Sequence, residues 1–117
     1  MRVGADGIII SNHGGRQLDS APSSIEALPQ VVNAAAPGLT VMLDSGVRSG
    51  TDIVKALASG ASFTFTGRTF MYGLGALNEP GARFVLDLIV NEVDKTLAQI
   101  GCKDIIELNT EYIWQNN

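Results

Sequence analysis

The chain has 117 residues, of which 45% are hydrophobic and 17% charged, and its formal net charge is −4. This length allows one domain with a buried core, and the composition fits a buried-sheet α/β protein better than a disordered chain. The acidic balance argues against a nucleic-acid-binding surface. One cysteine and one histidine exclude an internal disulfide and a Cys/His metal site.

No apolar run reaches the roughly 18 residues that a membrane-spanning helix needs. The first ten residues, MRVGADGIII, lack the pattern of a secretory signal. We therefore expect a cytoplasmic protein. Residues 1–117 contain no internal repeat, low-complexity tract or linker, so we expect them to form a single structural unit.

Three short apolar runs predict strands. Residues 7–11 (GIIIS) and 40–44 (TVMLD) are continuous and apolar, as in strands that are buried on both faces. Residues 62–66 (SFTFT) alternate, and that pattern alone is ambiguous. Each run leads into a loop that contains glycine.

Helical patterns fill the gaps between these runs. Ser23 to Glu26 has the pattern of a capping box, but Pro29 is awkward inside a helix. We therefore expect a short turn, followed by a helix that begins at Pro29 and stops at Pro37-Gly38. The next helix is expected to start at a cap formed by Ser49 or Thr51.

That second helix is expected to end at Gly60, and a third, longer helix to end at Gly101. Apolar residues recur in the third helix at helical spacing: Val85, Leu88, Ile89, Val93, Leu97 and Ile100. Cys102 is interpreted as a small residue at the helix end rather than a nucleophile. The tail predicts a short turn and a docked or loose end, with Tyr112 and Trp114 as docking aromatics.

The predicted order alternates strand and helix three times. Such an order implies parallel strands joined by crossover helices. Two architectures fit: a small open α/β sheet, or part of a (β/α)8 barrel, which normally needs about 250 residues. In both, ligands bind at the carboxyl ends of the strands.

Glycine and arginine follow each predicted strand, in residues 12–17 (NHGGRQ), 44–50 (DSGVRSG) and 67–68 (GR). Glycine lets backbone N–H groups approach an anion, the helix after Ser49 offers its positive end, and arginine binds phosphate oxygens in pairs. The glycines alone fit ordinary turns, but an arginine at each strand end favours an anion site. Asp44 has the wrong sign to bind phosphate and is better suited to bind ligand hydroxyls or to orient an arginine.

His13 and Arg16 suit a different task. Histidine exchanges a proton near neutral pH, and arginine binds a planar carboxylate. A lone histidine is often structural, but the position of His13 at a strand end, three residues before Arg16, favours catalysis. The pair fits a substrate with a carboxylate beside a C–H or O–H bond.

Three segments, GADGIIISNHGGRQLD, LDSGVRSGTDIVKALASGA and TGRTFMYGL, resemble the C-terminal part of the FMN-dependent 2-hydroxy acid oxidase/dehydrogenase family. This family includes glycolate oxidase, lactate oxidase and flavocytochrome b2. The DSG variant and the segment YGLGALNEPGARFVLDLI are most similar to the L-lactate and mandelate dehydrogenase branch. The resemblance implies a partial (β/α)8 TIM barrel made of about three βα units, the sixth to the eighth.

The resemblance also implies roles for individual residues. His13 matches the catalytic base and, with Arg16, the substrate-binding group. The residues that match the two FMN-binding loops are Asp44, Ser45, Gly46 and Arg48 in the first, and Gly67 and Arg68 in the second. The implied reaction oxidises an L-2-hydroxy acid to the 2-oxo acid, with two electrons passing to FMN and no metal involved. The resemblance leaves open whether His13 takes the α-proton or the hydroxyl proton.

The resembling enzymes are complete barrels of eight strands, whereas this chain is expected to begin just before the sixth. The substrate-facing tyrosines, the aspartate that orients the histidine and a lysine beside the flavin are therefore expected to lie elsewhere. A half-barrel exposes apolar faces and strand edges, so we expect a homo-oligomer and little turnover from these residues alone. The alternatives are a half-barrel that binds FMN or another phosphate ligand without turnover, and an oligomeric truncation product without ligand. Mandelate dehydrogenases of this family attach to membranes through a segment outside the region of resemblance.

Overall fold

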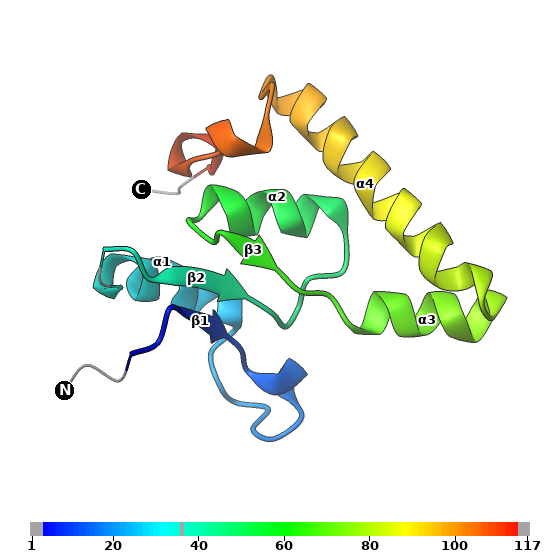
Figure 1. Ribbon diagram of the computed structural model, residues 1–117, viewed down its shortest axis with the longest axis horizontal. Helices are drawn as coiled ribbons and strands as arrows, with labels where there is room; N and C mark the ends of the chain where they lie inside the picture. The colour runs from blue at the N-terminus through cyan, green and yellow to red at the C-terminus, as the bar shows by residue number, and fades with distance from the viewer. Residues whose placement is uncertain (1–3, 36, 115–117) are drawn as a thin grey trace.

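The computed structural model describes residues 4–35 and 37–114. Within them, three parallel strands form one sheet in the order β1-β2-β3. The strands are β1 (Gly7–Ile10), β2 (Thr40–Leu43) and β3 (Phe63–Thr64). The helices are α1 (Ser24–Ala34), α2 (Gly50–Ala58), α3 (Arg68–Leu77) and α4 (Pro80–Ile100) (Figure 1). The expected alternation of parallel strands and helices is confirmed, with a shorter third strand and one additional helix.

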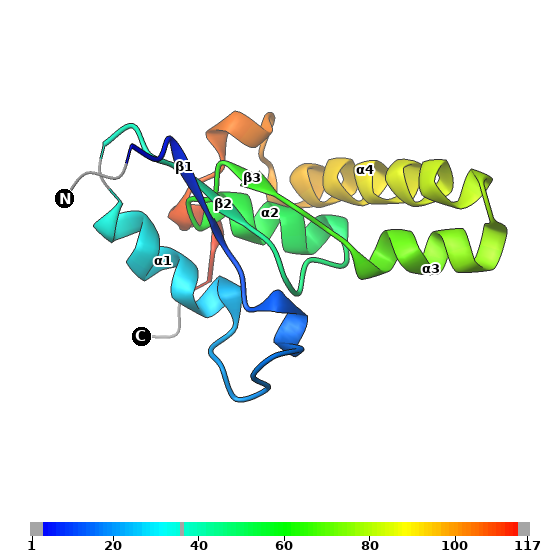
Figure 2. The ribbon, with the colours of Figure 1, turned by 60° about the horizontal axis from the view of Figure 1, so that its bottom comes forward.

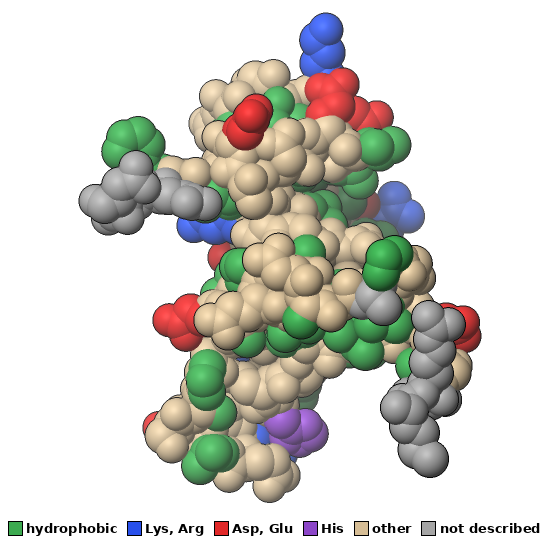
Figure 3. Space-filling model, turned by 90° about the vertical axis from the view of Figure 1, so that its left-hand side faces the viewer, with side chains coloured by type: hydrophobic (Ala, Val, Ile, Leu, Met, Phe, Trp, Pro, Cys, Tyr) green, Lys and Arg blue, Asp and Glu red, His purple; other side chains and the backbone are tan. Residues whose placement is uncertain are grey.

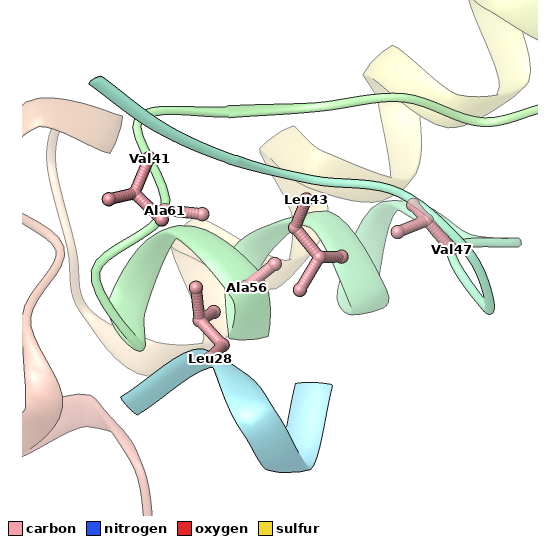
Figure 4. Packing of buried hydrophobic residues seen from close by; sticks show 6 residues of the cluster. All are labelled: Leu28, Val41, Leu43, Val47, Ala56 and Ala61. Carbon is pink, nitrogen blue, oxygen red and sulfur yellow. The ribbon is translucent and has the colours of Figure 1, made fainter. Parts of the chain in front are cut away.

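One face of the sheet carries the core. The buried cluster joins α1, β2 and α2, and consists of Leu28, Val41, Leu43, Val47, Ala56 and Ala61. Figure 4 shows Leu28 of α1 pointing toward β2 and α2. Leu28 is 0% exposed and Leu43 is 1% exposed. Burying a leucine side chain contributes about 1.5–3 kcal/mol, so this small cluster fixes both helices on the same face.

The opposite face of the sheet is bare. Ile9, Met42 and Phe63 pair across the three strands and therefore point to this side. Ile9 is 50% exposed and Phe63 is 54% exposed. The Phe63 ring contacts Phe65 edge to face, with centroids 5.0 Å apart. The expectation of strands buried on both faces is wrong for the described residues, because their helices cover only one side.

Helix α1 begins earlier than expected. Ser23 caps it: the Ser23 N–H and Oγ–H donate to Glu26 Oε2 (3.1 and 2.6 Å), and the Glu26 N–H donates to Ser23 Oγ (3.3 Å). Pro29 therefore lies inside α1, and the expected helix start at Pro29 is wrong. Pro29 is exposed, so water can reach the carbonyl that its missing N–H leaves unpaired.

The sequence did not predict α3, which forms a hairpin with α4. The two helices lie side by side (Figure 2). Gly73 and Gly81 make the contact, because a Cβ on Gly81 would overlap the Gly73 carbonyl oxygen. Glycine lowers helix propensity, and α3 contains two glycines in ten residues, which explains why its pattern is weak.

Helix α4 returns over α2 and ends as expected at Gly101, whose φ is +72°. Its buried residues include Val85, Ile89 and Leu97, whereas Leu88 and Ile100 are exposed. No helix in residues 4–35 and 37–114 is long and apolar enough to cross a membrane.

The C-terminal tail docks in part. Tyr112 packs against the buried cluster of Val54, Leu97 and Cys102. A hydrogen bond with the Cys102 side chain raises the pKa of Tyr112 above its ordinary value. The expectation that Tyr112 docks is confirmed, and the side chain of Trp114 is 88% exposed. Figure 3, viewed from the side where both chain ends lie, shows hydrophobic side chains at the surface among charged ones.

The hairpin contact can be tested with two glycine variants. Gly81→Ala should lower the free energy of unfolding by about 1–3 kcal/mol, because its Cβ forces α3 and α4 apart. Gly75→Ala is the matched control: its Cβ would meet nothing within 4 Å, so it should be neutral or stabilise by up to about 1 kcal/mol. Urea unfolding measures both, and equal effects of the two substitutions would contradict the packing.

The α1 cap predicts a pH dependence. The Ser23 hydroxyl, and then the Ser23 backbone N–H, lower the pKa of Glu26 below its ordinary 4.5. The stabilisation is therefore complete above the unfolded pKa and is lost as the pH falls through the folded value. Glu26→Gln keeps an acceptor at this position but does not titrate. Urea unfolding at several pH values should show that the natural chain has a larger free energy of unfolding than Glu26→Gln above pH 4.5, and that this difference disappears in acid. An advantage that does not vary with pH would refute this account.

Candidate functional site

The carboxyl ends of the three strands meet at one cavity of about 330 Å³. Its lining includes every site residue that the sequence predicted: His13, Arg16, Asp44, Ser45, Gly46, Arg48, Gly67 and Arg68. The strands are parallel and β2 is central, so the loops that follow them emerge side by side. Phe65 and Met71 add an apolar wall. The structure therefore brings together all the predicted site residues.

The histidine lies in a tight left-handed turn. Its φ is +57°, and Gly14 and Gly15 follow with φ of +68° and +74°. The Gly15 N–H donates to Asn12 Oδ1 at 3.2 Å and closes the turn. A positive φ costs little for glycine but is uncommon for histidine. Such a local cost is typical of a residue whose position matters for function.

Ser45 joins the histidine turn to the loop after β2. Its Oγ accepts the Gly14 N–H at 3.0 Å, and its hydroxyl lies 2.6 Å from Asp44 Oδ1. Ser45 also has a positive φ, +70°, and Gly46 follows with +81°. The loops after β1 and β2 are therefore held together by a side chain within the cavity.

The start of α2 does not offer the open amides that we expected. The N–H groups of Arg48 and Ser49 both donate to Asp52 Oδ2 at 3.0 Å. The Gly50 N–H donates to Glu92 Oε2 of α4 at 2.7 Å. Two carboxylates already satisfy this helix end, and they would repel an anion.

The start of α3 is open instead. Gly67 precedes its first turn, and no side chain caps it. Arg68 begins the helix, and its guanidinium lies close to the Gly14 backbone, since a Cβ on Gly14 would be 3.7 Å from Arg68 Nη2. Uncapped amides at a helix start attract an anion. The start of α3, rather than that of α2, therefore offers uncapped amides, and Arg48 and Arg68 line the same cavity.

Two threonines, one in the loop after β3 and one in the first turn of α3, are hydrogen-bonded to the loop after β2. Thr66 Oγ1 donates to the Val47 carbonyl at 2.7 Å, and Thr69 Oγ1 donates to the Arg48 carbonyl at 3.2 Å. The sequence did not single out these threonines, because threonine hydroxyls in a strand or helix carry no pattern of their own. Glu92 was missed for the same reason, as its partner is 42 residues away.

A larger cavity of about 480 Å³ lies beside the first and shares five lining residues with it: Gly14, Ser45, Gly46, Val47 and Arg68. Its other charged lining residues are Asp19, Asp52 and Lys55. The larger cavity is lined by two carboxylates and two cations, whereas the smaller one is lined by one carboxylate and three arginines. The smaller cavity therefore suits an anion better.

Comparison with known proteins identifies the family. The family model described as FMN-dependent dehydrogenase matches residues 1–115. The chain belongs to this family. Members of this family depend on FMN, a cofactor that carries a phosphate, and uncapped amides at the start of α3 are a suitable place for a phosphate.

Individual members of the FMN-dependent dehydrogenase family are closely similar. The chain is 54% identical over 110 residues to (S)-mandelate dehydrogenase of Pseudomonas putida, covering 94% of this chain and 28% of that protein. It is 44% identical over 111 residues to L-lactate dehydrogenase of Vibrio cholerae, and the match covers 95% of this chain and 29% of that protein. The chain thus spans less than a third of the length of these relatives.

A solved structure shows the same fold. The crystal structure of the monotopic membrane protein (S)-mandelate dehydrogenase matches with a TM-score of 0.91 and 52% identity, over 97% of this chain and 30% of that one. The structural neighbours are FMN-dependent TIM-barrel enzymes, and this chain corresponds to a partial α/β portion with three parallel strands.

Proposed function

We propose that these residues form the cofactor-phosphate end and part of the substrate site of an FMN-dependent enzyme that oxidises an L-2-hydroxy acid to a 2-oxo acid. One observation carries the proposal: a single cavity holds a histidine, a nearby arginine and two further arginines beside an uncapped helix start. A turn-forming role for the glycines would not require these charged groups to converge.

The residues present fit the phosphate and ribityl chain of FMN. Arg48 and Arg68 supply paired N–H donors, and Gly46 and Gly67 let backbone amides approach phosphate oxygens. Asp44 lines the same cavity, where its carboxylate suits ribityl hydroxyls. When bound, FMN accepts the two electrons of the oxidation.

His13 and Arg16 serve the substrate. Arg16 binds the carboxylate of the hydroxy acid through parallel N–H donors, which fixes the carbon that bears the hydroxyl. An imidazole nitrogen of His13 would take one of the two protons that the oxidation releases, and the second proton and both electrons would pass to FMN when it is bound. Phe65 and Met71 offer an apolar wall for a lactate-like or mandelate-like side chain, and the 54% identity to a mandelate dehydrogenase supports this substrate class.

We propose that the three βα units are the last three of an eight-stranded barrel. The bare face with Ile9 and Phe63 would then face the barrel interior, covered by further units of the same polypeptide or by another chain. Association of copies through this face and the free edges of β1 and β3 remains our prediction for the 117 residues alone. Light scattering at micromolar concentration tests it, and a stable monomer would contradict it.

The catalytic claim is tested by anaerobic reduction of the bound flavin in the protein with its complete barrel. (S)-Mandelate or L-lactate should bleach the flavin absorption, and His13→Gln should slow this bleaching about 100- to 10,000-fold, the usual effect of losing a general base. Flavin content should be unchanged, because His13 lies on the substrate side. Bleaching of the His13→Gln variant at the natural rate would remove His13 from catalysis.

The phosphate claim is tested separately by FMN affinity. Arg68→Ala should weaken FMN binding about 10- to 100-fold, since it removes hydrogen bonds to a charged group. Arg83→Ala is the matched control, because Arg83 lies exposed on α4 and pairs with Asp87 at 2.9 Å. Flavin fluorescence titration measures both variants. Equal losses would show that Arg68 acts only through overall charge.

A further inference from the structure

We infer that Ser45 is a positioning residue that sets the place of His13 relative to the loop after β2. This inference rests on the proposed function. It reassigns Ser45 from a cofactor contact to a link between the substrate side and the cofactor side of the cavity.

The hydrogen bonds of His13 hold its backbone rather than its side chain. Within residues 4–35 and 37–114, no hydrogen bond reaches the imidazole, and the His13 contact is made by its backbone. The His13 N–H donates to Ser11 Oγ at 3.1 Å, and the next N–H, of Gly14, donates to Ser45 Oγ at 3.0 Å. The position of the imidazole therefore depends on the backbone of the turn, which the two serine hydroxyls hold together with Asn12.

The two serines are themselves connected. Ser11 Oγ and Ser45 Oγ lie 3.4 Å apart, and Ser45 Oγ–H donates to Asp44 Oδ1 at 2.6 Å. A hydroxyl has one proton to donate, so Ser45, which gives its proton to Asp44, accepts from Ser11. The chain of donors therefore runs from the His13 N–H through Ser11 and Ser45 to the Asp44 carboxylate. A charged acceptor at the end strengthens each preceding bond.

The backbone at Ser45 supports this role. Its φ of +70° is a conformation that glycine adopts freely and that costs energy for serine. Hydrogen bonds to Gly14, Asp44 and Ser11 offset that cost. Ser45→Gly therefore removes the hydroxyl and relieves the backbone strain at once, whereas Ser45→Ala removes the hydroxyl and keeps the strain.

The test compares Ser45→Ala, Ser45→Gly and Ser11→Ala in the FMN-loaded protein with its complete barrel. Both Ser45 variants should lower the maximal rate of flavin reduction about 10- to 100-fold, as small displacements of a reacting group do. FMN affinity should change much less than the rate. Ser11→Ala should slow reduction by a smaller factor, because Gly14 keeps its bond to Ser45. Ser62→Ala, at the other end of the sheet before β3, is the control and should match the natural protein.

A second readout does not depend on turnover. Amide hydrogen exchange at His13 and Gly14 should quicken in both Ser45 variants and stay unchanged in Ser62→Ala. The inference would be overturned if both Ser45 variants reduced the flavin and exchanged their amide hydrogens at the rates of the natural protein. It would also be overturned if the variants lost FMN affinity by as large a factor as they lost rate. If the natural protein fails to reduce its flavin, the proposed function fails, and the exchange data alone then decide the role of Ser45.

Discussion

Parallel pairing of β1 and β3 on either side of β2 is the constraint on which the site depends. It places the ends of three strands, and the loops after them, at one edge of the sheet. Hydrogen bonds between loops then fix the detail: Gly14 to Ser45, Thr66 to Val47 and Thr69 to Arg48. Arg16, Arg48 and Arg68, which are 32 and 20 residues apart in the sequence, lie close together because parallel strands place their loops at the same edge of the sheet.

Much of this arrangement was predictable from local chemistry. Continuous apolar runs marked β1 and β2, Ser49 marked the start of α2, and Gly101 marked the end of α4. The prediction that the helix starts at Pro29 was wrong, because the capping box at Ser23 outweighs the one hydrogen bond that Pro29 loses inside α1. The sequence also predicted open amides at the start of α2, whereas the structure shows them at the start of α3. Asp52 was not singled out in the sequence, and nothing in the sequence shows that Glu92 reaches Gly50 from α4.

Closing α2 and opening α3 has a chemical consequence. Carboxylates of Asp52 and Glu92 accept N–H groups at the start of α2, whereas no side chain caps the start of α3, so our proposal places the cofactor phosphate at α3. His13 and Arg16 share the cavity but lie on another loop. The exposed sheet face fits our proposal that these residues form the phosphate end and part of the substrate site, and that further barrel units supply the remaining walls.

The central claim is that this chain recognises the phosphate of its cofactor. The most direct measurement compares the affinities of FMN and riboflavin, which differ only in that phosphate, for the flavin-free protein. Two arginines that donate to a charged group contribute about 1.5–3 kcal/mol each, so FMN should bind at least about 100-fold more tightly. Equal affinities for FMN and riboflavin would contradict the account.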